Sequence, residues 1–156
     1  MKTKDLAIQA MIATVYVAVS LAFQPLSFGA VQVRFAELTL LLLLINNKHA
    51  TGIVLGCFIT NLFSPLGMAD VIFGTLATAL TCFLMAKTEN DVLKLLWAAI
   101  INGVIVGAEL TILFGGVPFL FNLATVFAGE IIAVFIPGML FKTNIRNNKA
   151  LQQYFN

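Results

Sequence analysis

Charged residues are scarce in this chain, and their scarcity decides the class of protein. Only 10% of the 156 residues are charged, whereas 60% are hydrophobic and the mean hydropathy is +0.99. These values lie far outside the usual range of soluble domains. The sequence therefore predicts an all-α integral membrane protein, with residues 1–156 forming a single domain in the lipid bilayer. A net charge of +2 is too small to indicate a nucleic-acid partner.

Histidine and cysteine are nearly absent, which argues against an enzyme or a metal site. His49 is the only histidine and falls in a short polar stretch, so we expect it at the surface. Cys57 and Cys82 lie in apolar segments, with no second ligand at metal-binding spacing. No H-E-x-x-H motif is present, and one loop histidine leaves no buried Ser-His or Cys-His pair. We therefore predict no catalytic residue, no metal site and no enzymatic activity.

A glycine-rich phosphate loop is also missing. Neither Lys87-Thr88 nor Lys142-Thr143 is preceded by the glycines that cradle phosphate. We expect no cofactor in this chain, so any ATP-driven step must occur in a partner subunit. A signal-peptide cleavage site is likewise missing after the first apolar segment, which we expect to remain as a helix.

Six apolar segments alternate with short polar stretches and predict a compact bundle of six transmembrane helices. The second and third segments are shorter than the ~20 residues of a full span, so they must lean on their neighbours or thin the bilayer. The predicted helices cover residues 6–23, 33–45, 50–63, 71–86, 95–114 and 119–141, and a polar tail covers residues 142–156.

The basic residues orient this bundle. Eight of the nine fall in the N-terminus, the even-numbered loops or the C-terminus: Lys2, Lys4, Lys48, Lys87, Lys94, Lys142, Arg146 and Lys149. Only Arg34 lies on the other side. By the positive-inside rule, both termini are therefore predicted to be cytoplasmic.

A polar set in the outer half predicts a binding pocket open to the outside. On an ordinary helix Arg34 and Glu37 share a face and can pair with each other or with a solute. Asp70 stands where an N-cap is expected. Glu130 falls near the bilayer midplane, where a carboxylate is functional by default or links helices by hydrogen bonds. The candidate substrate-binding residues are Gln32, Arg34, Glu37, Asn61, Asp70, Glu109, Asn122 and Glu130.

Four stretches of the chain resemble one known family. They are VQVRFAELTLLLL (31–43), GCFITNLFSPLGMADVIFGTLAT (56–78), NGVIVGAEL (102–110) and AGEIIAVFIPG (128–138). The resemblance is to the QueT family, small six-helix substrate-binding (S) components of energy-coupling factor (ECF) transporters, and it extends over residues 4–138. It implies a bacterial plasma membrane, a queuosine precursor as solute, and a partner module of a transmembrane T subunit with two cytoplasmic ATPase subunits.

Small residues recur every four positions along the first predicted helix, at Ala10, Thr14 and Ala18. Such a stripe allows close helix approach, either inside the bundle or on its surface. The resemblance implies that this stripe docks on the T subunit.

The solute implied by the resemblance is a 7-deazaguanine, whose pairing edge carries two adjacent N–H donors and a carbonyl acceptor. A carboxylate can accept both donors at once. We expect Arg34 to neutralise Glu37 and Asp70 to cap its helix, which leaves Glu109 and Glu130 as the carboxylates that contact the solute. Asn61 or Asn122 could donate to the carbonyl.

A second interpretation remains open on the residues alone. Intramembrane carboxylates also serve as relays, so Glu109 and Glu130 could carry protons or cations in an autonomous secondary transporter or channel.

Overall fold

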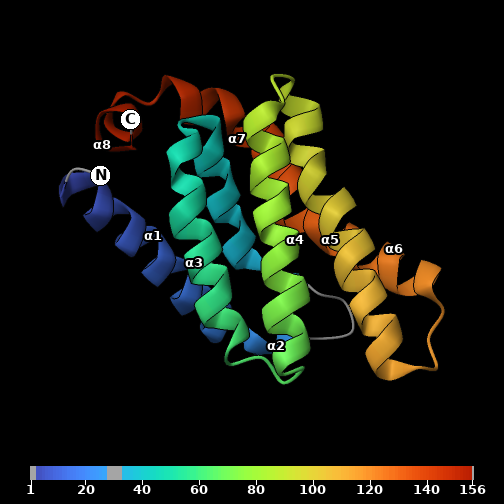
Figure 1. Ribbon diagram of the computed structural model, residues 1–156. Helices are drawn as coiled ribbons and strands as arrows, with labels where there is room; N and C mark the ends of the chain where they lie inside the picture. The colour runs from blue at the N-terminus through green and yellow to red at the C-terminus, as the bar shows by residue number, and fades with distance from the viewer. Residues whose placement is uncertain (1–2, 28–32, 156) are drawn as a thin grey trace.

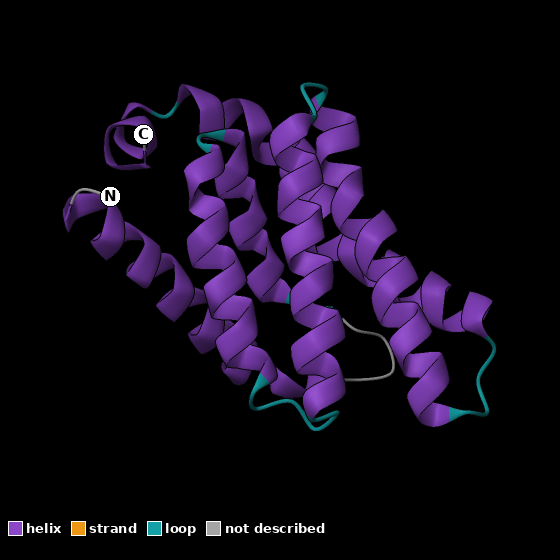
Figure 2. Cartoon of the chain, in the orientation of Figure 1, coloured by secondary structure: helices purple, strands orange, loops and turns teal. Residues whose placement is uncertain are grey.

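The computed structural model describes residues 3–27 and 33–155, and within these ranges the chain is helical and contains no strand (Figures 1 and 2). The elements are α1 (Thr3–Ala22), α2 (Gln24–Ser27), η1 (Phe35–Leu44), η2 (Asn47–His49), α3 (Ala50–Asn61), α4 (Met68–Lys87), α5 (Asp91–Phe114), α6 (Phe119–Glu130), η3 (Ile131–Phe135), α7 (Ile136–Asn147) and α8 (Lys149–Phe155).

Four helical stretches are long and apolar enough to cross a membrane. They are α1, α4, α5 and the continuous stretch α6–η3–α7 over Phe119–Asn147. The remaining two predicted spans are shorter, with 10 residues in η1 and 12 in α3. In Figure 1, α3 stands between α1 and α4 and packs against both. The all-helical architecture is confirmed, whereas the length criterion supports four spans and not the predicted six.

The second predicted helix is a 3-10 helix and not an α-helix. A 3-10 helix rises ~2.0 Å per residue, so the ten residues of η1 cover ~20 Å where an α-helix would cover ~15 Å. This geometry lets a short segment reach further through the bundle. Runs of this length are uncommon, and a 3-10 stretch in a helical segment often marks a functional or strained region.

The last predicted helix contains a π-helical turn, η3, which begins directly after Glu130. Pro137, near the start of α7, has no N–H, and its ring would clash with the carbonyl of residue 133 in a regular α-helix. The wider π turn just before Pro137 accommodates that constraint, and it makes the last predicted helix irregular. Such π turns are frequent at functional sites.

Several helix boundaries differ from prediction because polar residues cap the helices. Asn90 Oδ1 accepts the N–H groups of Val92 and Leu93 at 3.0 and 3.1 Å, so α5 begins at Asp91, four residues before the predicted start at residue 95. The predicted polar tail is also helical, since α7 continues to Asn147 and α8 follows.

One end of the bundle, which we call the basic end, holds both ends of the chain, η2 and the turn between α4 and α5 (Figure 1). Lys4 Nζ donates to the carbonyl of Gln153 at 3.4 Å, which joins the first and last helices (Figure 1). Ion pairs connect Lys48 with Asp5 at 3.3 Å and Arg146 with Asp91 at 2.7 Å. Apart from Arg34, the basic residues that the structure describes therefore gather at one end of the bundle. The sequence likewise predicts that these residues lie on one side of the membrane.

His49 is buried at this end, so the expectation of a surface histidine is wrong. Its Nε2 lies 2.5 Å from the carbonyl of Phe155, and its Nδ1 lies 3.2 Å from Gln9 Nε2. Burial lowers the pKa of His49, although the Phe155 carbonyl opposes that shift. The ring therefore joins α1, η2 and α8 as a neutral structural residue.

The apolar core forms two clusters. The larger one is built around Tyr16, Leu40, Ile53, Met85 and Leu95, and it joins α1, η1, α3, α4 and α5. The smaller one consists of Ala77, Val106, Leu110 and Val126, where α4, α5 and α6 meet. Together they hold the helices that carry the buried polar residues described next.

Candidate functional site

A buried ion pair joins the segment before η1 to the start of α4. Arg34 Nη2 donates to both carboxylate oxygens of Asp70, at 2.9 and 3.1 Å, and both side chains are buried. The expected pairing of Arg34 with Glu37 is therefore wrong, because Arg34 precedes the 3-10 helix and its side chain reaches across to α4.

Asp70 is also not an N-cap, contrary to prediction. Helix α4 begins at Met68, and its N-cap position is taken by Gly67 with φ 65° and ψ −141°, a conformation suited to glycine. Asp70 thus lies in the first turn of α4, where the helix dipole favours a negative charge. Its carboxylate is free of capping and is available to Arg34.

Glu37 accepts hydrogen bonds from two residues that are not among the predicted substrate-binding residues. Tyr16 Oη donates to Glu37 Oε1 at 2.5 Å, and Thr78 Oγ1 donates to the same oxygen at 3.1 Å. Glu37 Oε2 is buried without a partner among the described residues. Tyr16 could have been found, because it is the only tyrosine within a predicted span and a buried tyrosine hydroxyl usually has a partner.

Asn61 lies beside the ion pair at Gly74. Its Nδ2 is 3.2 Å from Thr75 Oγ1 and 3.4 Å from Cys57 Sγ, while its Oδ1 is buried without a partner among the described residues. A Cβ added at Gly74 would stand 2.5 Å from Asp70 Oδ1 and 2.8 Å from Asn61 Nδ2. Glycine at this position therefore permits the close approach, a requirement that the sequence pattern did not reveal.

Glu109 and Glu130 are buried acids with unused oxygens. Within the described part of the chain, both carboxylate oxygens of Glu109 and Oε2 of Glu130 have no hydrogen-bond partner. Glu109 interacts electrostatically with Asp70 and Arg34, and Glu130 with Glu37 and Arg34. Buried carboxylates without partners are costly, so they favour a site that receives donors from a ligand.

The structure brings some of the candidate residues together but not all of them. Arg34, Glu37, Asn61 and Asp70 form a buried constellation, and the charges of Glu109 and Glu130 act on it. Asn122 instead donates to Thr111 Oγ1 at 2.9 Å and so links α6 to α5. Gln32 lies outside the described residues. In the rest of the chain, no group of three His, Cys, Asp or Glu side chains could hold a metal ion.

The stripe of Ala10, Thr14 and Ala18 is exposed on the surface of α1. These residues line a groove of about 450 Å³ whose other wall is formed by Leu55 and Ile59 of α3. Thr14 Oγ1 donates to the carbonyl of Ala10 at 2.8 Å, so the hydroxyl is satisfied within its own helix. The stripe thus presents an apolar surface of small residues.

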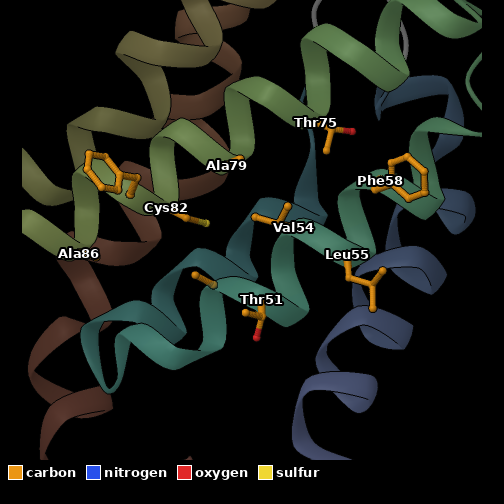
Figure 3. Close-up of a pocket in the computed structure, with 10 residues that line it drawn as sticks. Thr51, Val54, Leu55, Phe58, Thr75, Ala79, Cys82 and Ala86 are labelled. Atoms are coloured by element: carbon orange, nitrogen blue, oxygen red, sulfur yellow. The ribbon is translucent and has the colours of Figure 1, made fainter. Parts of the chain in front are cut away.

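A larger groove, of about 780 Å³, lies between α3 and α4 (Figure 3). None of the predicted substrate-binding residues lines it, and its walls are almost entirely apolar. The groove is therefore separate from the buried polar constellation.

Comparison with known protein families identifies a match over most of the chain. The model of the QueT transporter family matches residues 6–147, nearly the whole chain. No curated protein and no solved structure matches.

Proposed function

Because the chain belongs to the QueT transporter family, whose members are S components of ECF transporters, we propose that it captures a queuosine precursor of the 7-deazaguanine type for ATP-driven import. The observation that carries this proposal is the pair of buried acids, Glu109 and Glu130: both oxygens of Glu109 and Oε2 of Glu130 lack partners within the described residues, and both acids interact electrostatically with Arg34.

Glu109 is the acid best suited to the pairing edge of a deazaguanine. Both of its oxygens lack partners among the described residues, so it can accept two adjacent N–H donors. Glu130 offers one such oxygen and suits a second donor, such as the ammonium of an aminomethyl side group. Asn61 presents an acceptor in the structure, since its amide nitrogen already contacts Thr75 and Cys57, and this differs from the donor role that we expected.

We propose that six segments cross the bacterial plasma membrane, including η1 and α3, and that the basic end is cytoplasmic. The gathering of basic residues and both termini at one end supports this orientation. The constellation around Arg34 lies at the starts of η1 and α4, away from the basic end, and would then be in the outer half of the bundle, on the side from which an importer must collect its solute.

Cysteine labelling tests the orientation. Met68 begins α4, and Glu89 lies two residues beyond its other end; both are exposed, whereas the native Cys57 and Cys82 are buried. In whole cells, Met68→Cys should react with a membrane-impermeant maleimide and Glu89→Cys should react only after the membrane is opened. The reverse pattern would contradict the proposed orientation, and the unmodified protein controls for background labelling.

We further propose that the stripe of Ala10, Thr14 and Ala18 docks on a T subunit, and that two partner ATPase subunits use the ATP. Exposure of the stripe and its apolar, small-residue surface support this role. No ATP site is required in the chain itself.

The Ala18→Leu variant tests the docking role of the stripe, because it should affect transport but not solute binding. The larger side chain would block close helix approach at the stripe while leaving the buried constellation unchanged, so binding by the purified protein should persist and ATP-dependent uptake with the partner module should fall at least ~tenfold. Val15→Leu, at an exposed position of α1 beside the stripe, is the matched control. Uptake by this chain alone in liposomes, without ATP, would instead favour an autonomous transporter that uses Glu109 and Glu130 as a relay.

A further inference from the structure

The groove between α3 and α4, which we call the α3–α4 groove, is a candidate site that the proposed function does not use. Its walls are formed by Val54, Leu55 and Phe58 on α3 and by Ala79, Phe83 and Ala86 on α4 (Figure 3). Leu55, Phe58 and Phe83 are exposed, so the groove opens onto the surface that the membrane helices present to lipid. An elongated apolar groove on this surface can receive an acyl chain.

The length of the groove matches one leaflet of a bilayer. Along α4 the lining residues run from Ala86, next to the basic end, to Thr75. These residues are eleven positions apart, which corresponds to ~17 Å at the rise of an α-helix. Half of a ~30 Å hydrocarbon core is ~15 Å. The groove therefore extends from the interface at the basic end to about the middle of the membrane.

A positive charge stands at the mouth of the groove. Lys87 follows Ala86, and its Nζ lies 5.8 Å from the ring centroid of Phe83, which lines the groove. Lys87 is exposed and makes no ion pair with any residue that the structure describes. Nearby, Asn47 Nδ2 donates to the carbonyl of Ala86 at 3.3 Å, and this bond holds η2 and the start of α3 beside the same mouth.

From the shape, length and charge of the groove we propose that it binds one anionic phospholipid of the leaflet at the basic end. The acyl chain lies between α3 and α4, and the phosphate lies at Lys87. A lysine near the membrane surface attracts anionic lipid headgroups. Lys48 contributes less, because it already pairs with Asp5. The proposal does not depend on the identity of the solute. Leu55 also lines the groove beside the stripe, so the two grooves are neighbours on α3.

The end of the groove at Thr75, far from the basic end, adjoins the polar constellation. Thr75 lines the groove and accepts a hydrogen bond from Asn61 Nδ2 at 3.2 Å. A bound acyl chain would therefore pack against the turn of α4 that contains Gly74 and Thr75 and that contacts Asn61 of α3.

Lipid binding to the purified full-length protein tests the proposal, with phosphatidylglycerol as the anionic probe and phosphatidylcholine as the zwitterionic one. Native mass spectrometry should detect one tightly retained phosphatidylglycerol, with about fivefold preference over phosphatidylcholine. Lys87→Gln should remove this preference without unfolding the protein, because Lys87 is exposed. Ala79→Phe should fill the groove and reduce retention of both lipids.

Two control variants match these changes in chemistry. Lys149→Gln removes an equal charge from α8, and Leu76→Phe adds an aromatic ring on an exposed part of α4 that does not line the groove. Both should bind lipid like the wild-type protein. Equal retention of the two lipids by the wild type, or unchanged phosphatidylglycerol binding in Lys87→Gln, would overturn the proposal. Unchanged lipid binding in Ala79→Phe with loss of subunit assembly would assign the groove to a protein partner instead.

Discussion

Glu109→Gln and Glu130→Gln are each expected to weaken binding of a 7-deazaguanine by at least about tenfold, equivalent to about 1.4 kcal/mol. Each amide removes an anionic acceptor and introduces N–H donors where the solute presents its own donors. A hydrogen bond to a buried charged group contributes more than a neutral one, which is why a single substitution should have a large effect. Isothermal titration of the purified variants measures it.

The two glutamine variants should bind the solute more weakly without losing thermal stability. The Glu109 oxygens make no hydrogen bond within the described residues, and Glu130 Oε2 makes none either, so glutamine removes no contact seen at those atoms. Thermal unfolding temperatures equal to or above that of the wild type are therefore expected. Asp91→Asn is the matched control, because it neutralises a carboxylate at the basic end, where it pairs with Arg146. Wild-type affinity in both glutamate variants would remove these residues from the site and leave Glu37 and Asp70 as the candidates.

Arg34→Met is expected to destabilise the protein by roughly 3–5 kcal/mol, because it leaves the buried carboxylate of Asp70 without its cation. Methionine keeps much of the length of the arginine side chain, so the lost ion pair and not lost volume dominates the result. Chemical or thermal unfolding in detergent measures the change.

A double-mutant cycle separates the pair from the individual residues. Asp70→Asn alone should also destabilise, but in the Arg34→Met/Asp70→Asn protein the second substitution removes the unpaired charge, so the two effects should be less than additive. Arg146→Met provides the comparison, since the Arg146–Asp91 pair at the basic end is more exposed and should contribute less than about 1 kcal/mol. Destabilisation by Arg34→Met no larger than that by Arg146→Met would mean that the buried pair does not stabilise the fold.

The amino-acid sequence by itself determined the class of the protein, the approximate position of most helices and the location of its few charges. Apolar composition requires a membrane, and in lipid the backbone must satisfy its own hydrogen bonds, so helices follow. The same pattern placed Arg34, Glu37, Asp70, Glu109 and Glu130 among the residues of interest, and the structure describes all five as buried. The boundaries at Met68 and Asp91 were missed because they depend on caps provided by Gly67 and Asn90.

Only the tertiary structure decided which of these residues are partners. Spacing along one helix suggested Arg34 with Glu37, but the actual contacts join Arg34 to Asp70 and Glu37 to Tyr16 and Thr78, across helices that are distant in sequence. His49 was expected at the surface, but it is buried because α8 covers it. The physical reason is general: local periodicity reports the face of a helix, whereas the partner of a buried polar group depends on the packing of other helices, including the 3-10 geometry of η1 and the space left by Gly74.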